Sequence, residues 1–233
     1  MTQRTIAARA APTLEHLTNA MITAATQDFR HPTRLLVLFA AIWLVLAIAP
    51  VFRQDWLLEN LVVLITVPVL IMTRRTMPFS NGAYNALFVF LVLHEIGAHY
   101  TYAEVPYDRA WQSLFGFSLN DSLGFSRNHY DRLVHFLYGV LVIPAIVELY
   151  DVKAPPKGVW RFWLPVFFIM ANSSLFELIE WAAAIVFGGA LGQAYLGMQG
   201  DVWDAQQDMA LASLGGLLTM CVIAWRRRVI GKW

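Results

Sequence analysis

Six apolar runs dominate the pattern of hydrophobic and polar positions along the chain. A helix needs about 20 mainly apolar residues to cross a bilayer. The six runs approach that length, at residues 35–52, 56–72, 84–102, 130–150, 160–187 and 205–225. The pattern therefore predicts an all-α fold, a polytopic membrane helical bundle with about six transmembrane helices over residues 33–233. Residues 1–32 are predicted to form a cytoplasmic or interfacial N-terminal segment.

Basic residues divide unevenly between the two sides that six spans would define. With the N-terminus inside, 13 of the 17 lysines and arginines fall on the inner side. Positive charge concentrates on the cytoplasmic side of membrane proteins, so both termini are predicted to be cytoplasmic and the connections 103–129 and 188–204 to lie outside. No signal peptide is expected, because the first apolar run begins only at Leu35.

Composition supports a membrane protein and excludes several other classes. Charged residues make up 14% of the chain, whereas a soluble domain carries about 25%, and the mean hydropathy is +0.52. Part of the surface is therefore expected to face the lipid bilayer. The net charge of +1 argues against a nucleic-acid partner. The single cysteine, Cys221, excludes an internal disulfide and a cysteine-based zinc site.

Ionisable residues gather at one end of four of the predicted spans. Such groups are costly within a membrane and mark functional sites by default. On the predicted topology they lie at one depth and on the outer side, so we expect them to meet. The four clusters are His94, Glu95 and His99; Asp131 and His135; Glu177 and Glu180; and Asp201, Asp204 and Asp208.

Helical spacing pairs several of these side chains. Residues three or four apart share one helix face, which pairs Glu95 with His99 and Asp131 with His135. His94 and His99 are five apart, about 140° around a helix, so they are not expected to bind one ion together. The spacing also differs from the zinc-protease H-E-x-x-H and di-iron E-x-x-H motifs.

Imidazoles with several carboxylates form a nitrogen-and-oxygen ligand set that suits Zn, Mn or Fe better than Cu(I), Ca or Mg. We predict a divalent metal site, with zinc ranked before manganese and iron. Either Glu95 or Glu180 is the candidate general base, and Arg127 or Arg132 the candidate contact to an anionic head group. The predicted ligands are His99, Asp131, His135, Glu177 and Asp204, with His94, His129, Asp201 and Asp208 as further or alternative ligands.

These residues favour a metal-dependent hydrolase whose site opens toward the periplasmic side. The aromatic connection 103–129 suits a lipid or another amphipathic substrate. Two alternatives remain: a metal or proton transporter or sensor, and a scaffold in which the polar pairs only tie helices together. Polar residues are scarce toward the inner side, which favours chemistry over passage. The oligomeric state is left open.

Three polar motifs resemble a known family. The runs HEIGAHYTY at 94–102, RNHYDR at 127–132 and GDVWD at 200–204 are similar to those of the YjdF-like family of bacterial inner-membrane proteins, which carry a domain of unknown function. The resemblance covers roughly residues 35–228. It implies a multi-pass protein of the inner membrane and supplies no reaction.

Overall fold

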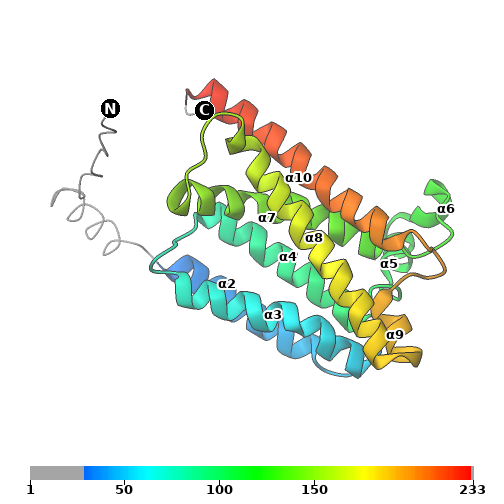
Figure 1. The fold of residues 1–233 in the computed structure, drawn as a ribbon. Coiled ribbons are helices and arrows are strands. Elements are labelled where there is room, and N and C mark those ends of the chain that lie inside the picture. Colours follow the sequence, from blue (N-terminus) through cyan, green and yellow to red (C-terminus); the bar gives the residue numbers. More distant parts are fainter. Residues whose placement is uncertain (1–28, 232–233) are drawn as a thin grey trace, which may run out of the picture.

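The computed structural model describes residues 29–231, and their regular secondary structure is entirely α-helical, which confirms the predicted class (Figure 1). Residues 1–28 of the predicted N-terminal segment lie outside the described part. The helices are α2 (Arg30–Leu46), α3 (Arg53–Thr73), α4 (Asn81–His99), α5 (Tyr107–Phe115), α6 (Leu119–Leu123), α7 (Tyr130–Lys153), α8 (Trp160–Phe187), α9 (Gly189–Leu196) and α10 (Asp204–Val229).

The six long helices lie side by side, and the short helices α5, α6 and α9 gather at one end of them (Figure 1). That end is called the α9 end below. Helices α3, α7 and α10 begin there, whereas α2, α4 and α8 run toward it. The polar clusters at the ends of different spans are therefore brought to one end of the bundle.

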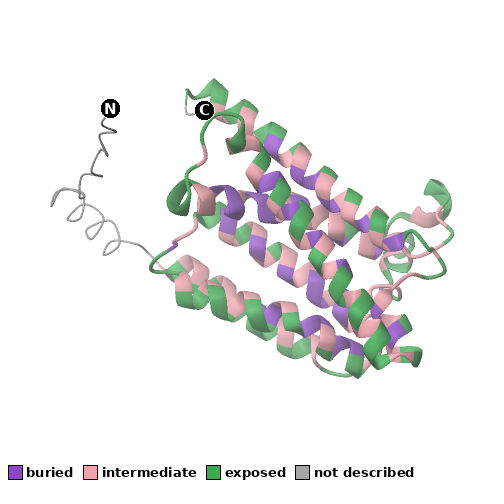
Figure 2. Ribbon diagram, in the orientation of Figure 1, coloured by how far each residue is buried: buried purple, intermediate pink, exposed green. Residues whose placement is uncertain are grey.

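Four of the described helices are long and apolar enough to cross a membrane, namely α3, α7, α8 and α10. Their outward surfaces carry many exposed apolar side chains, such as Leu64 on α3 and Val222 on α10 (Figure 2). A bilayer is the solvent that such surfaces require. Helix α2 has 17 residues and α4 has 19, and the predicted total of six spans stays a prediction.

The helix boundaries differ from the predicted runs mainly between the first two helices. The first run was expected to continue to residue 52, but α2 ends at Leu46. Ala49 has a positive φ of 48° and Pro50 follows it, so the helix cannot continue. Helix α3 begins at Arg53, three residues before the expected start, and includes Asp55 in its first turn. The bounds of α8 are those predicted.

Helices α7 and α10 make the closest backbone contact in the described bundle. A methyl group on Gly139 of α7 would overlap the carbonyl oxygen of Ala212 and the amide nitrogen of Gly216. One on Gly215 of α10 would overlap the carbonyl oxygen of Phe136. Small residues allow membrane helices to approach this closely. The contact lies about one turn from His135 and holds the polar ends of both helices together.

The largest cluster of buried apolar side chains lies away from the α9 end. Ile143, Ile169, Ala212 and Met220 are fully buried between α7, α8 and α10. The buried polar side chains are concentrated instead in the part of the bundle next to α9, as the bounds of their helices indicate. The bundle thus separates an apolar half that stabilises the fold from a polar half that holds the candidate site.

Candidate metal centre

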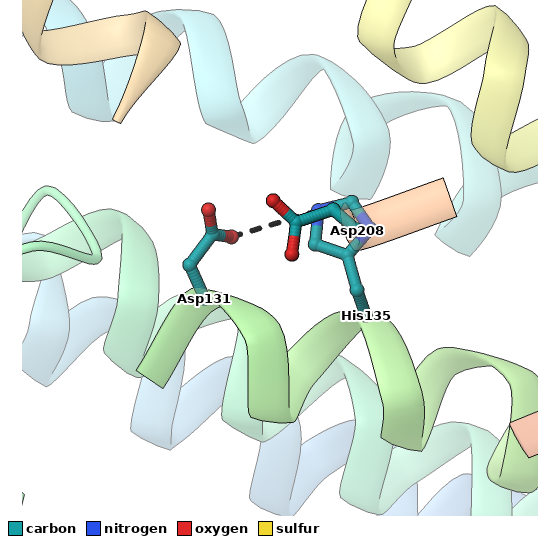
Figure 3. Close-up of side chains that lie close together, drawn as sticks. All are labelled: Asp131, His135 and Asp208. Carbon is teal, nitrogen blue, oxygen red and sulfur yellow. Dashed lines mark ion pairs between the residues drawn. The ribbon is translucent and has the colours of Figure 1, made fainter. Parts of the chain in front are cut away.

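Asp131, His135 and Asp208 form the group of side chains best arranged to hold a metal ion among the described residues. Each offers one ligand atom, and the three atoms lie within 4.8 Å of one another. Figure 3 shows Asp131 and His135 on one helix with Asp208 facing them from another. Asp208 is 2% exposed, so the group is shielded from bulk solvent.

The local sequence accounts for this arrangement. Asp131 and His135 are four residues apart on α7 and therefore share a face, with 3.5 Å between Asp131 Oδ1 and His135 Nε2. Asp208 lies in the second turn of α10. The close approach of α7 and α10 at Gly139 and Gly215 brings Asp208 within reach of the α7 pair.

Helix α8 supplies a third and a fourth acidic side chain. Glu177 Oε1 is 3.6 Å from His135 Nε2, and the Glu180 carboxyl group lies against that of Glu177. Glu177 is also buried. Four of the predicted site residues, Asp131, His135, Glu177 and Glu180, are thus neighbours, together with Asp208, which the sequence placed only among the alternative ligands.

The donor set fits a divalent cation. Glu177 Oε1 and Asp208 Oδ1 are buried and have no hydrogen-bond partner among the described residues. No lysine or arginine within residues 29–231 forms an ion pair with Asp131, Glu177 or Asp208. Buried carboxylates without a counter-charge are strongly unfavourable, and one imidazole with several carboxylates suits Zn²⁺ or Mn²⁺.

The two candidate substrate-binding arginines lie beside this group and are already paired with acids. Arg127 Nη1 is 2.7 Å from Asp204 Oδ1 and donates to the Met198 carbonyl at 2.9 Å. Arg132 donates to Asp201. The backbone N–H of Trp203, with Arg132 as a further cause, holds the pKa of Asp201 below its usual value. Asp204, a predicted metal ligand, and Asp201, an alternative ligand, thus each pair with an arginine.

His94 and His99 lie outside the group Asp131, His135 and Asp208, a candidate that is called the ion-binding group below. His94 Nε2 donates to the Glu59 carbonyl at 3.1 Å, and its Nδ1 accepts from the Tyr102 hydroxyl at 2.6 Å. Both ring nitrogens are thus occupied. His99 Nδ1 donates to the Leu46 carbonyl at 2.7 Å and ties the end of α4 to the end of α2.

The glycine of the 94–102 motif also has a structural role. A methyl group on Gly97 would lie 2.5 Å from the ring of Tyr102, so only glycine leaves room for that ring. Thr101 and Tyr102 both adopt positive φ angles, 53° and 51°, which turn the chain back over α4. This turn places the Tyr102 hydroxyl on His94. The motif is thus a connected set of contacts at the end of α4.

His129 lies at the start of α7 and takes no part in the ion-binding group. Its ring stacks on Phe125, with 3.9 Å between centroids, and its backbone N–H donates to the Tyr107 hydroxyl at 3.0 Å. This residue connects the α5–α6 segment to the bundle.

Helix α3 contributes two acids that are not among the predicted site residues. Asp55 and Glu59 are 1% and 2% exposed, and Glu95 of α4 is fully buried. The Glu95 carboxyl lies beside the side chains of Trp56 and Asn60. Glu59 is within electrostatic reach of both Glu95 and Glu177. The sequence contains a signal for these acids, because Asp55 and Glu59 are four residues apart at the start of the second apolar run.

Comparison with known proteins identifies the family. Residues 31–229 match the model of a family described as predicted membrane protein (DUF2238). The chain belongs to this family. It is also 36% identical to the inner membrane protein YjdF of Escherichia coli (strain K12) over 176 residues, which cover 74% of this chain and 78% of the relative. No solved structure matches.

Family membership and the apolar helices together confirm the predicted membrane class. The chain is a multi-pass protein of the inner membrane. The matched region includes every helix described above, from α2 to α10. The motifs that resembled the YjdF-like family thus lie within a match that covers nearly the whole described chain.

Proposed function

We propose that the protein is a membrane-embedded, metal-dependent hydrolase acting on a lipid or another amphipathic substrate. The observation that carries the proposal is the group Asp131, His135 and Asp208, with ligand atoms within 4.8 Å of one another and Glu177 directly beside it. These carboxylates form no ion pair with a described lysine or arginine. A divalent cation would neutralise them.

Zinc is the preferred ion, with manganese or iron as alternatives, because an imidazole with carboxylates is the donor set that these metals share. Such a cation would polarise a carbonyl or phosphoryl oxygen and lower the pKa of a water molecule toward about 7. Asp131, His135, Asp208 and Glu177 would hold it. No activity of the family supports one reaction over another, so the proposal extends to ester and phosphoester substrates alike.

Glu180 is the better of the two candidate general bases. It lies against Glu177, whose Oε1 is 3.6 Å from His135, whereas Glu95 lies on the other side beside Trp56 and Asn60. Glu180 would take a proton from the attacking water as the new bond to carbon or phosphorus forms. It would then return that proton to the departing alcohol, which balances the hydrolysis.

The arginines support an anionic substrate. Arg127 Nη2 and Arg132 Nε are buried and have no hydrogen-bond partner within the described residues. Each side chain therefore retains a donor beyond its ion pair with Asp204 or Asp201. A phosphate or carboxylate head group is the natural acceptor for such donors.

We further propose that α2 and α4 also cross the membrane, giving six spans with both termini in the cytoplasm. Both helices lie within the bundle beside the four apolar candidates (Figure 1). Leu38, Leu44 and Val45 of α2 are each at least half exposed, which suits a lipid-facing helix. The excess of basic residues at the end opposite α9 supports the orientation. The candidate metal centre would then face the periplasmic side.

Transport of an ion through the bundle is the weaker alternative. The cavity that reaches His135 continues toward the other end between apolar side chains, including Phe79, Leu87 and Ile146. A hydrated ion would find few ligands there, namely the neutral side chains of Thr66, Tyr138, Asn172 and Ser173, and its dehydration would be costly. This lining favours a site that acts from one side.

Metal content tests the proposed function directly. The protein would be purified in mild detergent without chelator and its metals measured by mass spectrometry. We expect about one equivalent in the wild type and at least a tenfold loss of affinity in His135→Ala and Asp208→Asn, since each removes a ligand. Hydrolysis of extracted membrane lipids would be measured on the same samples.

His99→Ala is the matched control. It also removes an imidazole, but one whose Nδ1 binds the Leu46 carbonyl. We expect it to retain the metal. A wild-type protein that binds no divalent metal, or equal loss in His99→Ala and His135→Ala, would contradict the proposal. Size-exclusion chromatography would verify that each variant is folded.

A further inference from the structure

A cavity of about 460 Å³ lies between α3, α4, α7 and α8. Ligand cavities in proteins have volumes of about 300–1,000 Å³, so this one is large enough for a ligand. Its lining is mainly aliphatic and aromatic. Val62 and Thr66 line it from α3, Val142 from α7, and Phe168 and Phe176 from α8.

The cavity reaches the outer surface of the bundle between α3 and α8. Helix α3 packs closely on α4 and on α9, and the cavity occupies the space between α3 and α8. Ile65, Val69, Leu175 and Ile179 line it and are also 46% to 65% exposed. Since these residues belong to two apolar candidate spans, the opening faces the hydrocarbon of the bilayer.

The other end of the cavity reaches the candidate metal centre. His135, His94 and Tyr102 are among the lining residues, and His135 also contacts Asp131 and Glu177. Ser173, which is 3% exposed, lines the cavity too, and its hydroxyl has no hydrogen-bond partner among the described residues. A ligand in the cavity would therefore have apolar contacts along its length and polar groups at one end.

We propose that this cavity binds the hydrocarbon chain of a bilayer lipid, which enters sideways between α3 and α8 and places the lipid's polar linkage at His135. Hydrolysis of that linkage rests on the proposed function. The binding of the chain itself rests only on the cavity and its opening.

The chemistry of the lining selects a hydrocarbon chain. Water in an apolar cavity lacks the two to four polar partners that it needs, and the surrounding solvent is lipid. His135 and Ile146 are separated by three turns of α7, about 16 Å, and both line the cavity. An extended chain held along this path would have its head group at the end where Arg127 and Arg132 lie.

Photochemical labelling tests the proposal. The full-length protein would be reconstituted in phosphatidylethanolamine–phosphatidylglycerol vesicles with a phosphatidylglycerol that carries a diazirine in one acyl chain. Labelled peptides would be identified by mass spectrometry. Lipids around the bundle label its exposed surface, but Val142 and Ala145 are 8% and 3% exposed and line the cavity. We expect labelling at these two buried residues in the wild type.

Filling the cavity should abolish that labelling. Ser173→Phe places a ring in the cavity without breaking a hydrogen bond, and a lipid chain that loses about 1 kcal/mol of apolar contact to the ring would bind about fivefold more weakly. We therefore expect at least about a fivefold loss of label at Val142 and Ala145. Thr66→Phe, on α3, is a second variant in case Ser173→Phe does not fold. Leu178→Phe is the control, because Leu178 is exposed on α8 and does not line the cavity.

The outcomes separate this proposal from the hydrolase. Buried labelling that both filling variants remove supports the chain site, even if the wild type binds no metal and the hydrolase proposal fails. Labelling restricted to the exposed surface overturns the chain site, even if the metal is present. Equal labelling at Val142 and Ala145 in wild type and in a folded filling variant overturns it as well.

Discussion

Acidic side chains are buried on two sides of the α9 end, and among the described residues arginines form ion pairs with acids on only one of those sides. On the α7–α10 side, Arg127 and Arg132 pair with Asp204 and Asp201, and glycines bring the two helices into backbone contact. On the α3–α4 side, Asp55, Glu59 and Glu95 are buried and form no ion pair with a described lysine or arginine. Helix α3 also borders the cavity.

The difference indicates that the two sides of the site have different roles. The α7–α10 side is held by charge pairing and close packing, which fix the positions of Asp131, His135 and Asp208. The α3–α4 side retains carboxylates that are unfavourable in the membrane interior unless they are neutralised. One side positions ligands, and the other adds buried acids without basic partners next to them.

Disrupting the glycine contact between α7 and α10 should cause the largest loss of stability. Gly139→Ala would force a methyl group against the backbone of α10, and we expect a loss of stability of about 3 kcal/mol or more. Gly82→Ala is the matched control, because its methyl group would meet only Ser80 Oγ, at 3.7 Å, and alanine favours the helix by about 1 kcal/mol. Thermal unfolding in detergent would measure both. Equal melting temperatures would show that the α7–α10 contact does not stabilise the bundle.

Neutralising one acid on each side should give opposite results. Asp204→Asn removes the closer of the two ion-pair partners of the buried Arg127 guanidinium, at 2.7 Å, and leaves Asp201 at 3.7 Å, which should destabilise the fold by about 3 kcal/mol. Glu59→Gln replaces a buried acid that has no basic partner and lies near Glu95 and Glu177, so we expect unchanged or increased stability. The two variants would be compared by denaturant unfolding in the same micelle. A similar loss for both would eliminate the proposed asymmetry.

Much of this organisation was predictable from the sequence. The apolar runs predicted the long helices, and the predicted bounds of α8 agree with the structure. The spacing of Asp131 and His135 placed them on one face, where they lie 3.5 Å apart. Both predictions depend on local periodicity, which a single helix expresses without its neighbours.

The sequence pattern does not predict which helices face one another. His99 is directed to the end of α2, although its spacing from Glu95 suggested a shared site. Asp204 binds Arg127, whereas Asp208, one turn further, joins the ion-binding group. Gly139 on α7 is isolated in the sequence, so its contact with α10 has no recognisable motif. Asp55 directly precedes the apolar run that begins at Trp56, so the hydrophobic pattern alone does not place it in the helix.

The α5–α6 segment should show the smallest effect. Asp108 accepts hydrogen bonds from the backbone N–H of Asn120 and from the Ser118 hydroxyl, both at 2.9 Å. The Asn120 hydrogen bond is the main cause that lowers the pKa of Asp108 below its usual 3.8. A depressed pKa stabilises the folded form fully above that ordinary value, and the contribution is lost as the pH falls through the lower folded value.

Asp108→Ala should therefore loosen this segment at neutral pH without changing the melting temperature of the bundle. Hydrogen exchange of residues 116–124, corrected for intrinsic rates, would measure the effect, and we expect it to be several-fold faster. The wild type should lose the same protection only below about pH 4. Exchange that Asp108→Ala leaves unchanged would assign the order of this segment to Tyr107 and Asn120 instead, which also share a hydrogen bond.

The order of the helices along the chain has a consequence for how the protein is made. The ion-binding group combines Asp131 and His135 of α7 with Asp208 of α10, which is synthesised after the other described helices. Asp55, Glu59 and Glu95 enter the membrane before Arg127, Arg132 and α10 have been synthesised. We therefore expect the chain to carry acids without basic partners through the insertion machinery. Only α10 supplies Asp208, so a truncation before residue 204 would leave Asp131 and His135 without it.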